Sequence, residues 1–131
     1  MSKLADLLPA ADVVVLIVPL TPETHHLIGA DALARMKQGA LLVNAARGPV
    51  VETDALVTAL NENRIRAALD VTDPEPLPEG HPLWKAPNLL LTPHVGGSSP
   101  LYMSRAFDLV AEQVKRFAHG EPLKNVVEGD Y

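Results

Sequence analysis

The segment "IRAALDVTDPEPLPEGHPLWKAPNLLLTPH" (65–94) decides the fold of this chain. It begins and ends with apolar runs, "IRAALD" (65–70) and "NLLLT" (88–92), and neither run alternates cleanly between apolar and polar residues. Continuous apolar strands are buried on both faces, as in parallel sheets covered by helices. The five prolines in residues 71–87 predict an ordered loop between the two strands, without a regular helix.

Two further apolar runs precede this segment, "VVVLIV" (13–18) and "ALLVN" (40–44). The residues between successive runs are numerous enough for the crossovers that parallel strands require. The crossover after the second run contains "DALVTALNEN", which predicts a helix that Thr53 can cap. The residues before the first run, "SKLADLLPA" (2–10), are expected to form the last turns of another helix.

A long helix is predicted over about residues 100–119. Ser98 or Ser99 can cap its start, and Gly120 suits its end. Its apolar residues recur at steps of three and four and form one stripe: Met103, Phe107, Val110, Val114 and Phe117. Alternating helices and strands indicate an α/β fold, with about four strands in a doubly wound parallel sheet and a long C-terminal helix.

Composition limits the class of protein. The 131 residues correspond to one domain (1–131), and a net charge of −5 disfavours nucleic acid or an anionic membrane as a partner. The chain has no cysteine, which excludes disulfides and thiolate metal sites, and its longest apolar run is far below the roughly 20 residues of a membrane span. His25 and His26 lack a suitably spaced third ligand, so no metal site is predicted. A cytoplasmic setting is expected.

Candidate site residues follow each apolar run where its strand should end. Pro19 and Thr21 follow the first run, Arg47 the second, Asp70 and then Glu75 the third, and His94 the fourth. Because ligands bind outside the carboxyl ends of parallel strands, the topology brings these residues to one edge of the sheet. Each residue alone could be a solvated or turn residue, and their convergence is what favours a functional site.

The residue types at this edge suit one kind of chemistry. An arginine matches a carboxylate with two parallel hydrogen bonds, and an imidazole exchanges a proton near neutral pH. A carboxylate on the other ring nitrogen fixes the tautomer of that imidazole. Arg47, Glu75 and His94 together would suit oxidation of a hydroxyl beside a carboxylate, and the hydride would need a cofactor because no side chain accepts one.

Four stretches closely resemble the D-isomer-specific 2-hydroxyacid dehydrogenase family: "VPLTPETHHLI", "GALLVNAARGPVVETDALVTAL", "RIRAALDVTDPEPLPEGHPLW" and "NLLLTPHVGG". They occur in the family's order, and the resemblance covers about residues 4–127. It implies a partial Rossmann fold. It also implies hydride transfer between a 2-hydroxy or 2-oxo acid and NAD or NADP, with NAD favoured.

The resemblance also implies roles for individual residues. Arg47 would bind the substrate carboxylate and polarise the reacting carbonyl, while His94 would be the acid–base group and Glu75 its partner. Asp70 would bond the nicotinamide carboxamide. The other positions that would line the cofactor, besides Arg47 and His94, are Pro19, Thr21, Ala45, Ala46, Val95, Gly96 and Gly97.

One family motif does not occur in these residues. The family's cofactor domain opens with a G-x-G-x-x-G turn, and the 131 residues contain no such spacing. The chain is therefore expected to be an inactive fragment, the C-terminal part of a dinucleotide-binding domain, with the glycine-rich half and the substrate domain absent. It is expected to bind NAD weakly or not at all.

An exposed first strand has a further consequence. Unpaired apolar edges recruit another chain, so a homo-oligomer is expected, formed through residues 13–18 or through the helix at 100–119. The alternative to a dehydrogenase is a non-catalytic, corepressor-like binding module derived from the same fold.

Overall fold

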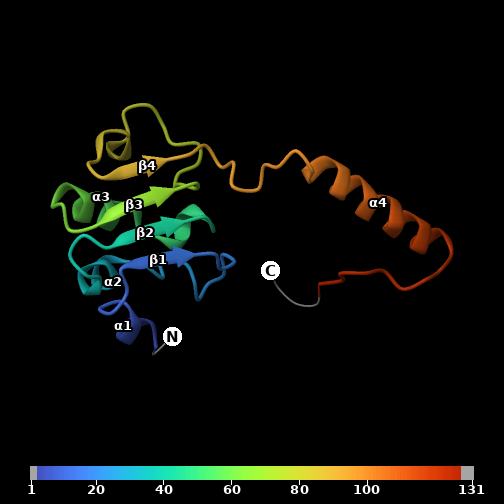
Figure 1. Cartoon of the computed structure of the whole chain (residues 1–131), viewed down its shortest axis with the longest axis horizontal. Coiled ribbons are helices and arrows are strands. Elements are labelled where there is room, and N and C mark those ends of the chain that lie inside the picture. Colours follow the sequence, from blue (N-terminus) through green and yellow to red (C-terminus); the bar gives the residue numbers. More distant parts are fainter. Residues whose placement is uncertain (1–2, 128–131) are drawn as a thin grey trace. The chain divides into compact units, whose positions relative to one another are not determined.

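A computed structural model of the protein describes residues 3–127 (Figure 1). Its centre is one parallel sheet in the order β1-β2-β3-β4. The strands are Val13–Leu16 (β1), Leu41–Asn44 (β2), Arg66–Leu69 (β3) and Leu89–Leu91 (β4). Each strand lies within the apolar run that predicted it, so the prediction of about four parallel strands is confirmed.

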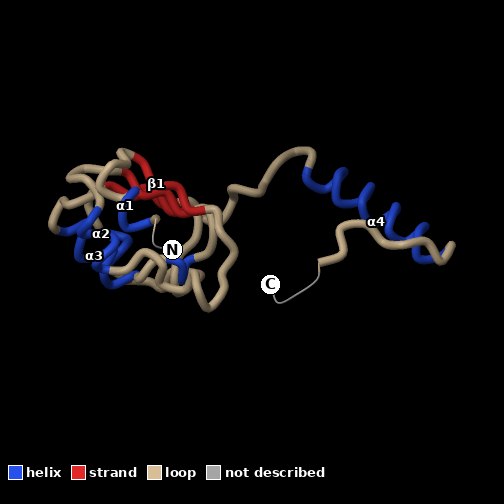
Figure 2. Tube along the Cα trace, turned by 90° about the horizontal axis from the view of Figure 1, so that it is seen from below, coloured by secondary structure: helices blue, strands red, loops and turns tan. Residues whose placement is uncertain are grey.

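Short helices connect the strands. They are α1 (Leu4–Leu7), α2 (Ala30–Arg35) and α3 (Thr53–Asn61), with the 3₁₀ turns η1 (Gly48–Val50) and η2 (Pro82–Lys85). Figure 2 shows α2 and α3 on the same side of the strands, where they pack against each other. The helix expected over 2–10 is present as α1, and Ser2 itself lies outside the described residues.

The pleat of the sheet separates a covered face from an open one. Leu42 and Leu69 are buried with the helix residues of the core. On β1, by contrast, Val13 is 51% exposed and Val15 is 55% exposed. In the described part of the chain β1 pairs with β2 alone, so it is an edge strand with apolar side chains in water. Self-association through this strand stays a prediction.

The predicted Thr53 cap of the helix α3 was wrong. The N-cap of α3 is Glu52, without a side-chain cap, while the hydroxyl of Thr53 donates to the Asp73 carbonyl oxygen at 2.9 Å. Thr53 therefore anchors the loop after β3 by a hydrogen bond and does not cap its own helix.

The loop after β3 also contains the 3₁₀ turn η2, which was not predicted. Pro82 is compatible with η2 because the first turn of a helix needs no bonded N–H at that position.

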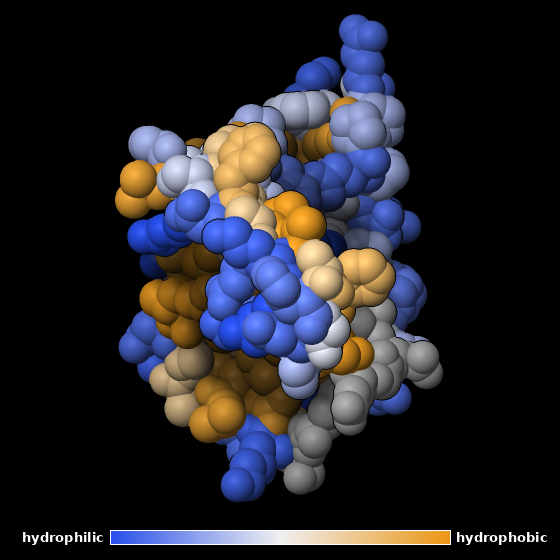
Figure 3. Space-filling view, turned by 90° about the vertical axis from the view of Figure 1, so that its right-hand side faces the viewer, coloured by the Kyte–Doolittle hydropathy of each residue, from blue (hydrophilic) through white to orange (hydrophobic). Residues whose placement is uncertain are grey.

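The described chain divides into two compact units, and residues 96–127 form the second. Its main element is α4 (Tyr102–Ala118), which confirms the predicted C-terminal helix. Leu101 is its N-cap, and the predicted serine cap is absent: the Ser99 hydroxyl accepts a hydrogen bond from the Leu101 N–H at 3.1 Å. The residues of the predicted apolar stripe are exposed. Figure 3 shows that hydrophobic residues (orange) lie among hydrophilic ones (blue) on the face that it draws.

The segment after α4 folds back along the helix. The Gln113 side chain bonds the backbone of Lys124 through both its amide N–H and its amide oxygen. The Lys124 ammonium bonds the carboxylate of Glu112, and this hydrogen bond lowers the pKa of Glu112 below its ordinary value. Within residues 3–127, none of the helices is both long and apolar enough to cross a lipid bilayer.

A close approach joins the turn after β2 to the loop after β3. Gly48 is buried beneath Thr72, and a Cβ atom at position 48 would lie 1.9 Å from the Thr72 carbonyl oxygen. Only glycine leaves room for this contact between two backbones. The turn that carries Arg47 and the loop that carries Glu75 therefore pack directly against each other.

We expect Gly48→Ala to lower the free energy of unfolding by about 1–3 kcal/mol, because the added methyl group must push the two backbones apart. Urea unfolding followed by circular dichroism measures this loss. Gly97→Ala is the matched control, since a Cβ at position 97 meets nothing within 4 Å. An equal effect of the two substitutions would contradict the close contact at Gly48.

We expect Lys124→Met to raise the pKa of Glu112 toward its ordinary value, since the variant lacks the hydrogen bond that favours the ionised carboxylate. In the wild type the folded-state pKa is depressed. The stabilisation is therefore present above the unfolded-state pKa and is lost as the pH falls through the folded-state pKa. Carboxyl carbon shifts followed by NMR during an acid titration report the change. Lys115→Met is the control, because it removes a positive charge from α4, the helix that carries Glu112. If Lys115→Met raised the pKa of Glu112 as much as Lys124→Met does, the specific hydrogen bond from Lys124 would be contradicted.

Candidate active site

The turn after β2 is shaped by a buried asparagine. The side chain of Asn44, at the end of β2, donates to the Arg47 carbonyl oxygen at 3.0 Å and accepts from the Ala46 N–H at 3.0 Å. Asn44 is 1% exposed, and among the described residues it is the one polar residue that is buried in the core. Both bonds hold the turn so that Arg47, which is exposed, follows the carboxyl end of β2. The guanidinium donates to the Ala46 carbonyl oxygen at 2.7 Å.

The loop after β3 carries Asp70 and Glu75. Its first part is tied down by two threonine hydroxyls: Thr53 donates to the Asp73 carbonyl oxygen and Thr72 donates to the Pro74 carbonyl oxygen, each at 2.9 Å. Both anchors hold backbone that directly precedes Glu75. Glu75 lies in a segment without regular structure, but the backbone before it is held by Thr53 of the helix α3.

The turn after β4 carries His94 in a left-handed conformation, with φ of 52°. One carboxylate oxygen of Asp70 accepts from the Thr92 hydroxyl and from the Val95 N–H, the second at 2.9 Å. These bonds lie on either side of His94 in the sequence. A left-handed residue other than glycine persists where its surroundings hold it, and Asp70 supplies that support at this turn.

His94 and Glu75 meet directly. The Nδ1 atom of His94 lies 2.8 Å from Oε1 of Glu75, and the two side chains are 48% and 38% exposed. When the carboxylate is ionised, Nδ1 carries the proton that it donates to Glu75. The Nε2 atom then has a lone pair with which to take a proton from a ligand.

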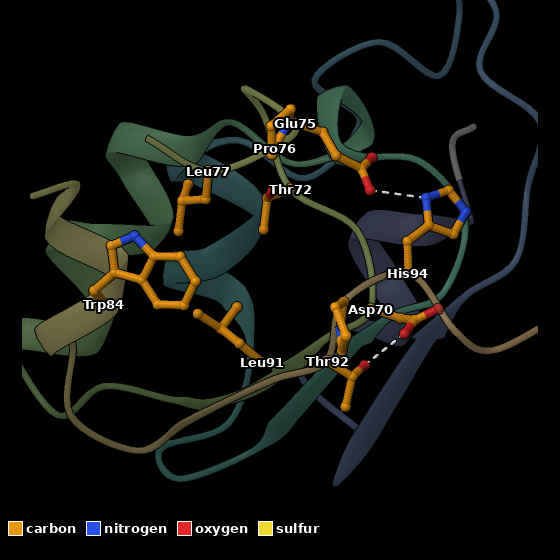
Figure 4. Close-up of a pocket in the computed structure, with 10 residues that line it drawn as sticks. Asp70, Thr72, Glu75, Pro76, Leu77, Trp84, Leu91, Thr92 and His94 are labelled. Atoms are coloured by element: carbon orange, nitrogen blue, oxygen red, sulfur yellow. Dashed lines mark hydrogen bonds and ion pairs between the residues drawn. The ribbon is translucent and has the colours of Figure 1, made fainter. Parts of the chain in front are cut away.

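The pair lies on the wall of a cavity of about 270 Å³ (Figure 4). Ten residues line it: Asp70, Thr72, Glu75, Pro76, Leu77, Trp84, Leu91, Thr92, Pro93 and His94. Figure 4 shows the polar pair at one end and the indole of Trp84 at the other, with leucines between them. The ends of β3 and β4 thus contribute to one cavity, as the parallel topology predicts.

A second, smaller groove of about 100 Å³ crosses the carboxyl ends of β2, β3 and β4. Its lining residues are Val43, Asn44, Ala45, Ala68, Leu69, Asp70, Leu90 and Thr92. Most are small or apolar, and Asp70 is the carboxylate among them. Asp70 and Thr92 belong to both cavities, so the two lie next to each other at this edge of the sheet.

The predicted site residues do not all lie in one cavity or contact one another. The structure brings Asp70, Glu75 and His94 into one cavity, but no hydrogen bond links Arg47 to that pair in the described residues. Pro19 and Thr21 follow β1 and belong to a local turn. There the Thr24 hydroxyl donates to the Pro19 carbonyl oxygen and accepts from the Thr21 N–H, each at 2.7 Å.

The remaining predicted residues differ in their surroundings. Ala45 lines the smaller groove and Ala46 is buried in the core. Val95 donates to Asp70, while Gly96 and Gly97 belong to the second unit. In residues 3–127, no three histidine, aspartate or glutamate side chains are grouped as metal ligands would be.

Sequence reasoning missed two residues that shape the site, Asn44 and Thr92. Asn44 ends an otherwise apolar strand, and a polar residue at such a place must find partners in the adjoining turn. That signal was available in "ALLVN". Thr92 gives no comparable signal, because its bond to Asp70 spans 22 residues and depends on the pairing of β3 with β4.

The sequence of the chain is similar to the sequences of known proteins. Residues 1–96 match the family model for the NAD binding domain of D-isomer specific 2-hydroxyacid dehydrogenases. Over 92% of its length the chain is 47% identical to a glyoxylate reductase of Thermofilum pendens, and over 93% it is 46% identical to a D-3-phosphoglycerate dehydrogenase of Methanocaldococcus jannaschii.

Solved structures give the same result. A D-isomer specific 2-hydroxyacid dehydrogenase from Xanthobacter autotrophicus, in complex with NADPH and MES, is 41% identical, with a TM-score of 0.86 over 98% of this chain and 52% of the other. The apo D-mandelate dehydrogenase of Rhodotorula graminis is 35% identical, with a TM-score of 0.87 over 98% of this chain and 37% of the other.

The chain is shorter than these relatives: it spans 36% of the glyoxylate reductase and 23% of the phosphoglycerate dehydrogenase. The family match nevertheless covers residues 1–96 of 131, well over half of the chain. By its sequence and its fold, the chain belongs to the D-isomer specific 2-hydroxyacid dehydrogenase family.

Proposed function

We propose that this chain supplies the acid–base residues and part of the nicotinamide site of a dehydrogenase that interconverts 2-hydroxy acids and 2-oxo acids. The observation that carries the proposal is the 2.8 Å contact between His94 and Glu75 at the carboxyl edge of the sheet. A relative that is 47% identical over 121 residues is a glyoxylate reductase, which makes a small 2-oxo acid the first substrate to test.

His94 is the proton carrier in this proposal. When a 2-hydroxy acid is oxidised, Nε2 takes the hydroxyl proton and the ring becomes an imidazolium. The Glu75 carboxylate on Nδ1 stabilises that cation and keeps Nε2 free to accept. In the opposite direction the same nitrogen returns the proton to the carbonyl oxygen as the hydroxyl group re-forms.

Arg47 is the candidate for binding the substrate carboxylate. Its guanidinium is exposed, and its backbone is held by the buried Asn44. The Nη1 atom donates to the Ala46 carbonyl oxygen, while a guanidinium has further N–H groups with which to form two parallel bonds to a carboxylate. A cation at this edge would also polarise the carbonyl group beside that carboxylate.

The groove across β2, β3 and β4 fits the nicotinamide end of NAD or NADP. Its small and apolar side chains, among them Ala45, Ala68 and Leu90, offer space for a flat ring, and the Asp70 carboxylate, the group that the family resemblance assigns to the nicotinamide carboxamide, lies on its wall. Bound there, the nicotinamide would supply the hydride chemistry that side chains lack. The chain's own part is to hold that ring beside the groups that carry the proton and the carboxylate.

A chimera tests the proposed function. The present chain replaces the matching 121-residue segment of the Thermofilum pendens glyoxylate reductase, and NADH consumption is followed with glyoxylate. We expect the chimera to reduce glyoxylate and His94→Ala to lower its kcat by about 100- to 10,000-fold, the range of general acid–base catalysis.

The matched control in the chimera is His119→Ala, which removes an exposed histidine beyond the end of α4. It should leave kcat unchanged. A chimera that stays folded, as checked by circular dichroism, and is equally active before and after the His94→Ala substitution would refute the proposed role of the histidine.

We further propose that the 131 residues alone bind NAD weakly or not at all and show no turnover. They contain no G-x-G-x-x-G turn to receive the pyrophosphate. Calorimetric titration of the chain with NADH should therefore give no saturable heat, and Asp70→Ala should give the same trace as the wild type. A dissociation constant of about 1 µM, which is about −8.2 kcal/mol, would contradict this.

A further inference from the structure

The loop that places Glu75 is short of backbone donors. Three of the five residues from 74 to 78 are prolines, which have no N–H group. The loop can therefore be held mainly through its carbonyl oxygens. Those of Asp73 and Pro74 accept from threonine hydroxyls on the side before Glu75, as described above. The position of Glu75 also depends on what holds the backbone that follows it.

On that side the anchor is the carbonyl oxygen of Pro78. It accepts the indole Nε1–H of Trp84 at 2.9 Å and the backbone N–H of His81 at 3.2 Å. Trp84 lies in η2, whose neighbouring residue Leu83 is 2% exposed and packed in the core. A series of contacts thus runs from the core through Leu83 and Trp84 to the backbone three residues after Glu75.

The side chain of Trp84 gains little from burial. It is 56% exposed, and one side of its ring faces the cavity together with Leu77 and Leu91 (Figure 4). Single exposed apolar side chains are common on protein surfaces, so the distinguishing feature of Trp84 is its hydrogen bond. Its donor group, which phenylalanine and leucine lack, is engaged with the loop of the glutamate.

We propose that Trp84 is a positioning residue for the proton carrier: its indole N–H holds the Pro78 carbonyl and thereby keeps the Glu75 carboxylate on Nδ1 of His94. The catalytic meaning of this placement rests on the proposed function, whereas the placement itself does not. Trp84 acts through Glu75 and touches neither the substrate nor the cofactor in this proposal.

The test uses the chain as it is and reads the tautomer of His94 directly. At about pH 9 imidazoles are neutral, and ¹⁵N shifts distinguish a ring protonated at Nδ1 from one protonated at Nε2. We expect the wild type to favour the Nδ1–H form, because that proton binds Glu75. His94→Gln assigns the signal among the five histidines of the chain.

Trp84→Phe keeps an aromatic ring and removes only the donor. We expect it to raise the ratio of the Nε2–H form to the Nδ1–H form by about two- to tenfold, as expected when one ordinary hydrogen bond is weakened. Glu75→Ala marks the full loss of the partner. Tyr102→Phe, which likewise removes only the donor from an exposed aromatic ring, but on α4, should leave the ratio unchanged.

A second measurement keeps the proposal testable if Trp84→Phe fails to fold. Trp84 is the one tryptophan of the sequence, so its indole N–H gives a single NMR signal. Its hydrogen exchange should be slowed in the wild type by the bond to Pro78. Exchange as fast as in the urea-unfolded chain, or an unchanged tautomer ratio in a folded Trp84→Phe variant, would overturn the positioning role. If the chimera is inactive but Trp84→Phe changes the tautomer ratio of His94 as expected, only the proposed function is refuted and the positioning role of Trp84 stands.

Discussion

Parallel pairing is the constraint on which the candidate site depends. Four strands that run in one direction deliver the residues after each of them to the same edge of the sheet. Asp70 and His94 are 24 positions apart in sequence, yet both line one cavity because β3 and β4 are neighbours in register. An antiparallel arrangement of the same strands would place alternate turns at opposite ends, and the contact between His94 and Glu75 could not form.

Much of this arrangement could be predicted from the sequence. Unbroken apolar runs indicated the strands, and the distances between them required crossovers, so the edge that carries Arg47, Asp70, Glu75 and His94 followed from topology. The ends of α3 and α4 were also readable, because an asparagine or a glycine with a positive φ follows each of them, at Asn63 and Gly120. These signals are local, and local backbone preference was sufficient for them.

The contacts that position the site were less predictable, because they join segments far apart in the chain. Thr53 was interpreted as a helix cap, a local role, but its hydroxyl holds a carbonyl 20 residues away. The fit of Gly48 beneath Thr72 and the bond from Thr92 to Asp70 depend likewise on how neighbouring loops pack. A single sequence carries little information on such contacts, since threonine and glycine suit many other positions as well.

The prolines around Glu75 affect the chain before it folds as well as after. Pro74, Pro76 and Pro78 each have a fixed φ, so the unfolded segment samples fewer conformations than an ordinary loop of that length. Ordering it therefore loses less entropy, by about 0.4–1 kcal/mol for each compatible proline. A few hydrogen bonds to carbonyl oxygens can then suffice to hold a carboxylate in place, and the protein needs no helix or strand at that point to do so.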